Sequence, residues 1–252
     1  MNINSMVFIT AFLPAVFVLD RLCGRHMKAK NLLLLLASLV FYAWGDVAYL
    51  VLLAVSIGIN YGLGIWLDSK RESGSLARLL LTLGIVINLG FLGYYKYFNA
   101  LLGLLNDLSG RQLFLQRSIP LPIGISIFTF SAISYLVDLY RGRYPAEKNP
   151  VDMALYLSFF PKISVGPIAR YQDIGPQLKQ REQSPQKTVE GVRRFVYGLA
   201  KKMLLANILG GFVDKVYGLG IAEVTGVMAW GAALLYPLQI YYDFSGFADM
   251  AV

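Results

Sequence analysis

VAYLVLLAVSIGINYGLGIWL, residues 47–67, is a long run without a charged side chain. A helix needs about 20 predominantly apolar residues to cross the hydrocarbon core of a bilayer, and this run is long enough. Three further uncharged runs have similar lengths, namely Leu79–Tyr95, Ile119–Val137 and Val224–Tyr242. The sequence therefore predicts an all-α, polytopic integral membrane protein. Two shorter apolar runs, Asn31–Gly45 and Val7–Leu19, are candidates for further helices, and we interpret the second as a retained first helix rather than a cleaved signal peptide.

The overall composition agrees with this assignment. Of 252 residues, 56% are hydrophobic and 15% are charged, and the mean hydropathy is +0.55. Ordinary globular domains carry about 25% charged residues. The net charge of +8 fits the excess of Lys and Arg in the cytoplasmic loops of membrane proteins, so we predict no nucleic-acid partner. The single cysteine, Cys23, excludes an intrachain disulfide, and the single histidine, His26, excludes a His-rich zinc site, so no metal is predicted.

The basic residues also predict the orientation of the helices. Residues 1–6 carry no Lys or Arg, whereas the loop at residues 20–30 carries four. The loops at residues 20–30, 68–78 and 141–150 are therefore predicted to face the cytoplasm, and residues 96–118 to face outward.

The segment Val151–Ala169 is apolar but contains Lys162, Pro161 and Pro167. A charge at a helix centre costs about 3 kcal/mol on insertion scales. Proline also frees backbone groups that lipid cannot satisfy. We interpret this segment as a re-entrant or in-plane piece on the cytoplasmic side, buried by other helices.

A basic amphipathic helix is predicted to follow. Ser184-Pro185 is a typical helix start, with Ser as the N-cap and Pro in the first turn. Valine and leucine then recur at helical spacing, with cations on another face, so the helix is expected to lie on the cytoplasmic surface. It leads into the apolar stretch Met203–Ala222, and the sequence leaves open whether that stretch spans the membrane and on which side Asp243 emerges.

Polar residues in apolar surroundings are the functional candidates. The first group lies in Ser158–Tyr171, whose broken backbone could line a polar cavity, or could be a bent connector whose Lys162 extends to the headgroups. The second group lies in Tyr241–Met250, where Gly246 could relax the backbone, or an ordinary helix could end in water. Asp243 and Asp249 do not share one helical face, which does not support a two-carboxylate acid–base pair. The candidate residues in these two segments are Lys162, Pro167, Arg170, Tyr242, Asp243, Ser245 and Asp249.

These two segments resemble motifs of the membrane-bound O-acyltransferase family, particularly its bacterial polysaccharide branch. The similarity is to FFP-x4-GPI-x-R at Phe159–Arg170 and to DFSG-[FY]-x-D at Asp243–Asp249. Asn31–Asp46 and Leu121–Gly142 also resemble that branch, and the similarity covers essentially the whole chain in order.

The resemblance implies an enzyme with many membrane helices around a funnel, located in the bacterial cytoplasmic (inner) membrane. The expected reaction transfers an acetyl group from a donor, acetyl-CoA or an acyl-carrier protein, to hydroxyls of an exported polysaccharide such as alginate. The acceptor would be the polymer or a periplasmic acetyl-transfer partner, and no bound cofactor is expected.

The family's signature histidine, the presumed general base, follows the DFSG segment in relatives. This sequence has none there, and His26 lies in the wrong part of the chain. We therefore expect residues 1–252 to form the N-terminal part of one membrane domain, with no catalytic residue and no catalysis from this part alone. A transporter or translocation module is one alternative, because it shares the intramembrane charges and broken helices. A non-catalytic scaffold for a secretion complex is another.

Overall fold

A computed structural model describes residues 3, 5–24, 26–45, 47–109, 120–163, 166, 168–181, 184–220 and 223–251. Every regular element among them is a helix, which confirms the predicted all-α class. The chain divides into two compact units, Met1–Ser164 with Ile168–Arg181, and Val165–Pro167 with Glu182–Val252. Pro167, Arg25 and residues 110–119 lie outside the described residues, together with the predictions made for them.

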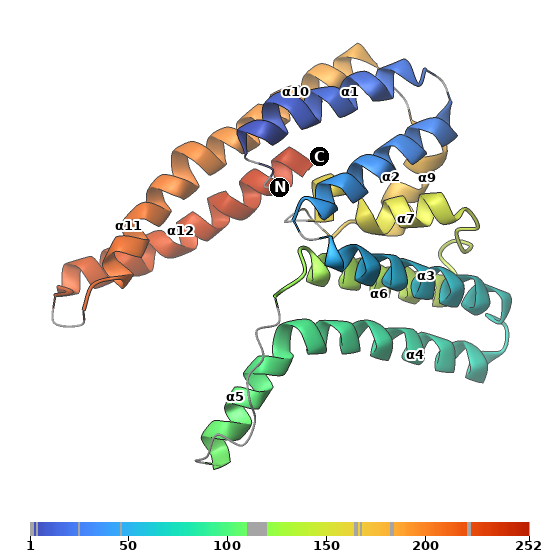
Figure 1. Cartoon of the computed structure of the whole chain (residues 1–252), viewed down its shortest axis with the longest axis horizontal. Coiled ribbons are helices and arrows are strands. Elements are labelled where there is room, and N and C mark those ends of the chain that lie inside the picture. The colour runs from blue at the N-terminus through green and yellow to red at the C-terminus, as the bar shows by residue number, and fades with distance from the viewer. Residues whose placement is uncertain are drawn as a thin grey trace. The chain divides into compact units, whose positions relative to one another are not determined.

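The first unit contains the helices from η1 to α9 (Figure 1). They are η1 (Phe8–Phe12), α1 (Leu13–Leu22), α2 (Met27–Ala43), α3 (Ala48–Ser69), α4 (Gly74–Leu92), η2 (Gly93–Tyr97), α5 (Phe98–Ser109), α6 (Ile125–Tyr140), α7 (Pro150–Ser158), α8 (Phe160–Ile163) and α9 (Tyr171–Lys179). Here η marks a π-helical turn.

The uncharged runs of the sequence do form long helices. Three helical stretches of the described chain are long and apolar enough to cross a membrane, namely Ala48–Ser69, Gly74–Ser109 and Pro185–Tyr217. Helix α6 is a shorter apolar helix, and α12 (Gly226–Ala251) contains the fourth uncharged run from its third residue onward. The structure thus supports a polytopic membrane protein. It also shows that the run at 79–95 continues helically to Ser109, farther than its uncharged residues indicate.

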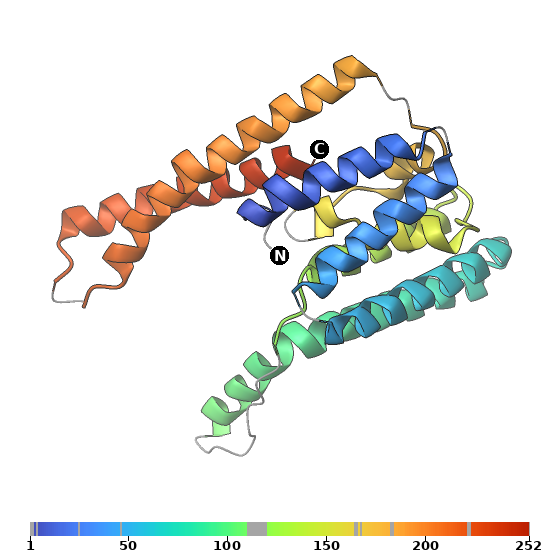
Figure 2. The same cartoon turned by 45° about the horizontal axis from the view of Figure 1, so that its top comes forward.

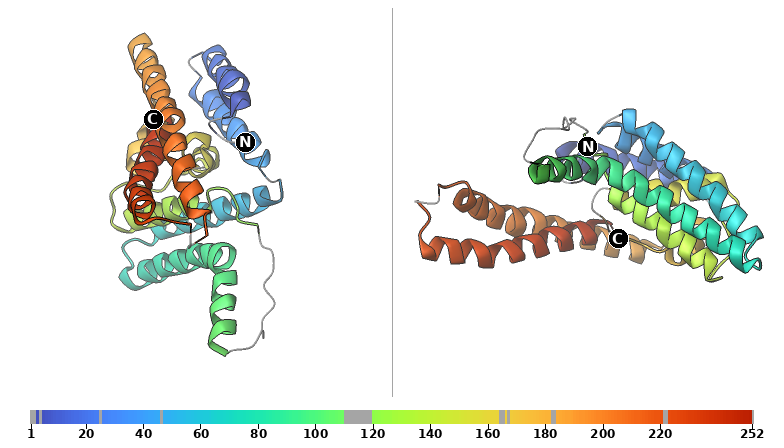
Figure 3. Two further views of the ribbon diagram at one scale, coloured as in Figure 1. Left: turned by 90° about the vertical axis from the view of Figure 1, so that its left-hand side faces the viewer. Right: turned by 90° about the horizontal axis from the view of Figure 1, so that it is seen from below.

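Helix α6 forms the centre of the first unit, beside α3 and α4 (Figure 3). Phe128, Ala132, Tyr135 and Leu136 of α6 are essentially fully buried. Helices α3 and α4 are joined by two buried amides, because Asn60 Nδ2 lies 3.1 Å from Asn88 Oδ1 and Asn88 Nδ2 lies 2.8 Å from Asn60 Oδ1. A reciprocal amide pair satisfies polar groups that lipid could not.

The second unit is a helical hairpin (Figure 2). Its first arm runs from α10 (Pro185–Ala200) through η3 (Lys201–Ala206) into α11 (Asn207–Tyr217), and its second arm is α12. Ser184 caps α10 as predicted, since its Oγ accepts a hydrogen bond from the Lys187 N–H at 3.1 Å. The helix continues without interruption from Pro185 to Tyr217, so the predicted amphipathic helix and the apolar stretch up to Tyr217 form one helix.

Candidate functional site

The backbone of the FFP segment is broken, as its prolines predict. Helix α7 ends at Ser158, Phe159 adopts extended ψ, and α8 begins at Phe160. The freed N–H of Phe160 donates to Ser38 Oγ of α2 at 3.1 Å. Gly124, with φ of 70°, lies against the other end of α8, where a Cβ would stand 1.9 Å from the Ile163 carbonyl oxygen. A side chain at position 124 would therefore displace α8.

Lys162 lies within this break and is 3% exposed. Its Nζ has no hydrogen-bond partner among the described residues, and it lies 3.9 Å from the centre of the Tyr156 ring. A cation over an aromatic face is attracted by the ring, but that attraction is weaker than the hydration it replaces. Burial therefore lowers the pKa of the Lys162 amine from 10.5 to about 7.

The position of Lys162 excludes one arrangement considered for this segment, in which the amine extends to the headgroups. A connector lysine that extends to the headgroups would have its amine at the surface, and this amine is enclosed by protein. The prediction that other helices bury the segment is thus confirmed. The geometry therefore offers an amine that is partly protonated near pH 7 and that can bind an anionic group or hold a proton.

Tyr156 connects Lys162 to a cluster of tyrosines. Its hydroxyl lies 3.1 Å from the Ala169 carbonyl oxygen and 3.3 Å from that of Ser131, which fixes the chain beyond the break to α6. Its ring packs edge-to-face on Tyr171, with 5.1 Å between ring centres. Tyr171 directly follows Arg170, the last residue of the matched motif.

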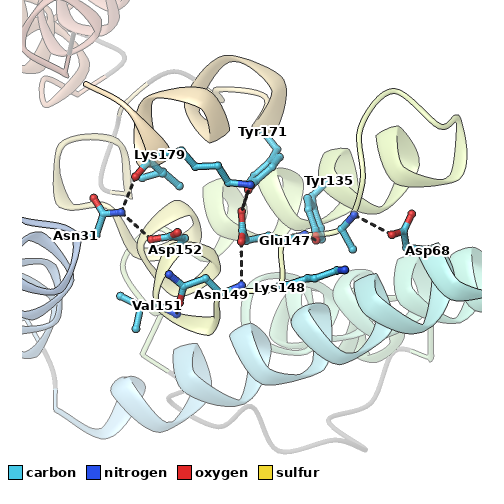
Figure 4. Close-up of polar contacts among 12 residues, drawn as sticks. Asn31, Asp68, Tyr135, Glu147, Lys148, Asn149, Val151, Asp152, Tyr171 and Lys179 are labelled. Carbon is cyan, nitrogen blue, oxygen red and sulfur yellow. Dashed lines mark hydrogen bonds and ion pairs between the residues drawn. The ribbon is translucent and has the colours of Figure 1, made fainter. Parts of the chain in front are cut away.

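Glu147 is the centre of a polar network beside this cluster (Figure 4). Its carboxylate is 4% exposed, accepts hydrogen bonds from the Tyr171 hydroxyl and the Asn149 N–H, and pairs with Lys179 at 3.4 Å. Burial alone would raise the pKa of Glu147, but these hydrogen bonds and the Lys179 charge outweigh it and lower the pKa. The Glu147 N–H also donates to Tyr135 of α6 at 3.0 Å. The network therefore attaches the loop before α7 to both α6 and α9.

A second buried contact anchors α2 to the same segment. Asn31 Nδ2 lies 2.7 Å from Asp152 Oδ1 of α7 and 2.8 Å from the Leu178 carbonyl oxygen of α9. Arg181 donates to Asn31 Oδ1. Hydrogen bonds thus attach the broken segment directly to α2 and α6.

In the second unit, each carboxylate of the DFSG segment has a cationic partner on α10 or η3. Asp243 pairs with Lys202, and Asp249 pairs with Lys201 at 2.6 Å and Arg194 at 3.2 Å. Lys201 Nζ also donates to Ser245 Oγ at 3.0 Å. Two consecutive lysines thus face one helix, at the start of the π-helical turn η3. Such turns shift the helical register and occur often at functional sites.

Gly246 has a different role from the one its sequence position predicts. It lies inside α12, which continues to Ala251, so it neither relaxes the backbone nor ends the helix. A Cβ at Gly246 would stand 2.8 Å from the Gly198 carbonyl oxygen of α10. The glycine therefore permits the close approach of two helices that brings the lysines to the carboxylates.

The remaining candidates have less informative surroundings. Arg170 is exposed and precedes α9 as its N-cap residue. Tyr242 is half-buried and packs edge-to-face on Tyr241, with ring centres 5.3 Å apart. His26 precedes α2 and is exposed. Among the described residues, no group of three His, Cys, Asp or Glu side chains could hold a metal ion.

Sequence reasoning missed Glu147, Tyr135 and Asp152. Glu147 stands in a basic loop and Asp152 at a helix start, both of which are typical of solvated carboxylates. Their burial depends on Tyr171 and Asn31, which are 24 and 121 residues away. One feature of the sequence could have indicated this burial. Asn31 is a polar residue at the start of an otherwise apolar run, and such a residue needs a hydrogen-bond partner when it is buried.

Comparison with known proteins finds similarity along the whole chain. Proteins named probable alginate O-acetylase from Pseudomonas aeruginosa and Azotobacter vinelandii are 40% and 39% identical over 255 residues, covering 100% of this chain in each case. A peptidoglycan O-acetyltransferase of Helicobacter pylori is 33% identical over 99% of the chain. The chain spans about half the length of these relatives, 48% to 52%. No family model matches the chain.

Proposed function

Because this similarity places the chain in the membrane-bound O-acyltransferase family, on the branch of the alginate O-acetylases, we propose that it acts in acetyl transfer to an exported polysaccharide. The observation that carries the proposal is the identity of 40% over the whole chain, which includes both matched motifs. Alginate is the proposed acceptor because the two most similar relatives above are named for it. The proposed donor is acetyl-CoA or an acyl-carrier protein.

We assign the two matched segments to the path of donor and acceptor, and no catalytic residue to this chain. Lys162 supports this assignment because an unpaired buried amine destabilises a fold and persists where it has another use. Asp243, Ser245 and Asp249 support it because they form one charged cluster with the two lysines at η3. Pro167, Arg170 and Tyr242 are assigned by the motif alone.

We place the protein in the bacterial inner membrane as a multi-pass protein. The ion pairs put Asp243 and Asp249 at the end of the hairpin that carries Lys201 and Lys202, and the positive-inside rule assigns that end to the cytoplasm. The residues between the two arms, 218–225, carry no Lys or Arg and would face outward. A donor made in the cytoplasm would meet the charged end first.

A transporter or a scaffold could have the same membrane helices as an acetyltransferase. Loss of the gene would, however, give a different phenotype in each case. Relatives named above are acetyltransferases or acetylases, and no contact in the described residues favours transport. Loss of a transporter or scaffold would reduce the amount of polymer secreted, whereas loss of an acetyltransferase would leave polymer that lacks acetyl groups.

The test is deletion of the gene that encodes this chain in a polymer-producing strain, followed by complementation. The yield of secreted polysaccharide and its O-acetyl content per sugar are both measured. The proposal predicts near-normal yield, loss of O-acetyl groups and their return on complementation. Unchanged acetyl content with reduced yield would contradict it.

A further inference from the structure

The first arm of the hairpin carries an open cleft of about 470 Å³, of which the acyltransfer proposal uses only Lys201 and Asp249. Arg194, Tyr197, Lys201, Leu204 and Leu205 line it, with Asp249 from α12 at one edge. The spacing of three or four residues puts the five side chains of the first arm in one stripe along one helix face. All of these residues belong to the second unit.

The side chains of the stripe change from cationic to apolar along the helix. It begins with Arg194 and Lys201, whose side chains are 51% and 35% exposed, and ends with Leu204 and Leu205, which are 64% and 41% exposed. Tyr197 lies between the two cations and is 55% exposed. An exposed apolar surface next to exposed cations is unusual for a protein–water boundary, but it suits a membrane headgroup region.

The charge balance of the cleft favours an anion. Arg194 and Lys201 share one carboxylate, that of Asp249, so the cleft keeps one net positive charge. Arg194 meets Asp249 through Nε, and the terminal fork of a guanidinium is the part that pairs bidentately with phosphate. Arg193, which is exposed and adjacent in sequence, adds to the positive potential.

The position of the cleft along the helix indicates how deep in the bilayer its ligand would lie. The first arm carries cations up to Lys202, and the next charged residue is Asp214, so residues 203–213 are an uncharged run. The cleft crosses this boundary, with cations on one side and leucines on the other. Lipid phosphates lie at the same boundary in a bilayer, directly above their acyl chains.

We propose that this cleft binds an anionic phospholipid of the cytoplasmic leaflet. Arg194 and Lys201 bind the phosphate, Tyr197 lies between these two cations at the level of the phosphate, and an acyl chain packs along Leu204 and Leu205. Basic pockets at the cytoplasmic ends of membrane helices bind acidic headgroups through the same chemistry. A free phosphate or the phosphates of an acyl donor would use the cations without the leucine surface.

The test is native mass spectrometry of the full-length protein in detergent with added lipid. Phosphatidylglycerol is compared with phosphatidylcholine, which has the same phosphate and acyl chains but no net charge. The proposal predicts retained phosphatidylglycerol adducts and few phosphatidylcholine adducts. Equal retention of both lipids would overturn it, and so would displacement of phosphatidylglycerol by acetyl-CoA or by inorganic phosphate, which would identify the cleft as a site for those phosphates.

Two charge-matched variants locate the binding. Arg194→Gln removes one cation from the cleft, while Lys215→Gln removes one exposed cation from the other end of the same arm. Arg194→Gln should weaken phosphatidylglycerol binding about fivefold, the effect of one cation near an acidic headgroup. Lys215→Gln should leave it unchanged. Because Asp249 keeps Lys201 as a partner, Arg194→Gln should fold, and equal effects of both variants would overturn the location.

Discussion

Lys162 is a buried amine whose protonation the fold opposes. Its pKa lies at about 7 instead of 10.5, so between these values the unfolded chain binds a proton that the folded chain does not. The stability of the folded protein should therefore rise with pH through this window, and the destabilisation caused by Lys162 should be greatest below pH 7.

Substitution of Lys162 by methionine tests this account. The Lys162→Met variant keeps most of the side-chain volume and removes the charge, so it should stabilise the protein by about 1 kcal/mol or more at acidic pH. The measurement is the melting temperature of wild type and variant in detergent. The difference should be large at about pH 6 and clearly smaller at about pH 9, since the penalty declines as the pH rises from about 7 towards 10.5. A variant that melts below wild type at acidic pH would show that Lys162 has a stabilising partner.

Asp243 and Lys202 form a pair between the two arms of the hairpin. Lys202 is 16% exposed and Asp243 is 38% exposed, so their interaction is partly screened by solvent. We expect a coupling of about 1 kcal/mol in a double-mutant cycle built from Asp243→Asn and Lys202→Met. Melting temperatures of the four proteins give the coupling. Strictly additive effects would show that the pair contributes nothing measurable to stability.

At the scale of elements, the approach of α10 to α12 depends on Gly198 and Gly246. A Cβ at position 246 would stand 2.8 Å from the Gly198 carbonyl oxygen and 3.2 Å from the Lys202 nitrogen, both of which are backbone atoms. Gly246→Ala should therefore separate the helices and destabilise the protein by about 1–3 kcal/mol.

Gly191 provides the matched control for Gly246→Ala, because it lies in α10 with nothing within 4 Å of its Cβ position. Gly191→Ala should be neutral or stabilising by up to about 1 kcal/mol, since alanine favours a helix. Membrane abundance and melting temperature of both variants are the measurements. If the two alanines behave alike, the close packing at Gly246 is not what holds the hairpin.

The sequence predicted the long helices well, because an uncharged run long enough to cross a bilayer has few other stable forms. It also predicted the break near Lys162, where proline removes backbone donors. It did not predict that Pro185–Tyr217 is one continuous helix. The charged residues end at Lys202 because the environment of the helix changes there, whereas its backbone conformation continues. Nor did it predict the partners of Asp243 and Asp249, because these depend on a close approach of two helices that glycines on different arms of the hairpin permit.

At the scale of the whole molecule, the basic loops predict how the chain crosses the membrane. We expect cysteines at positions 70 and 148 to be accessible from the cytoplasm, and cysteines at positions 106 and 223 to be accessible from outside. Single cysteines are introduced after removal of Cys23 and labelled with an impermeant reagent in intact and in permeabilised cells. Labelling of position 70 or 148 in intact cells would contradict this topology.

The central claim is that the two matched segments serve acetyl transfer, and the most direct test is the acetyl content of the polymer. It is measured for wild type, Lys162→Met and Asp243→Asn of the full-length protein and divided by the amount of each protein in the membrane. The account predicts near-normal amounts of both variants. It also predicts a loss of about tenfold or more in acetylation per molecule, which corresponds to about 1.4 kcal/mol in the barrier. Normal acetylation per molecule in both variants would contradict it and leave the segments as structural connectors.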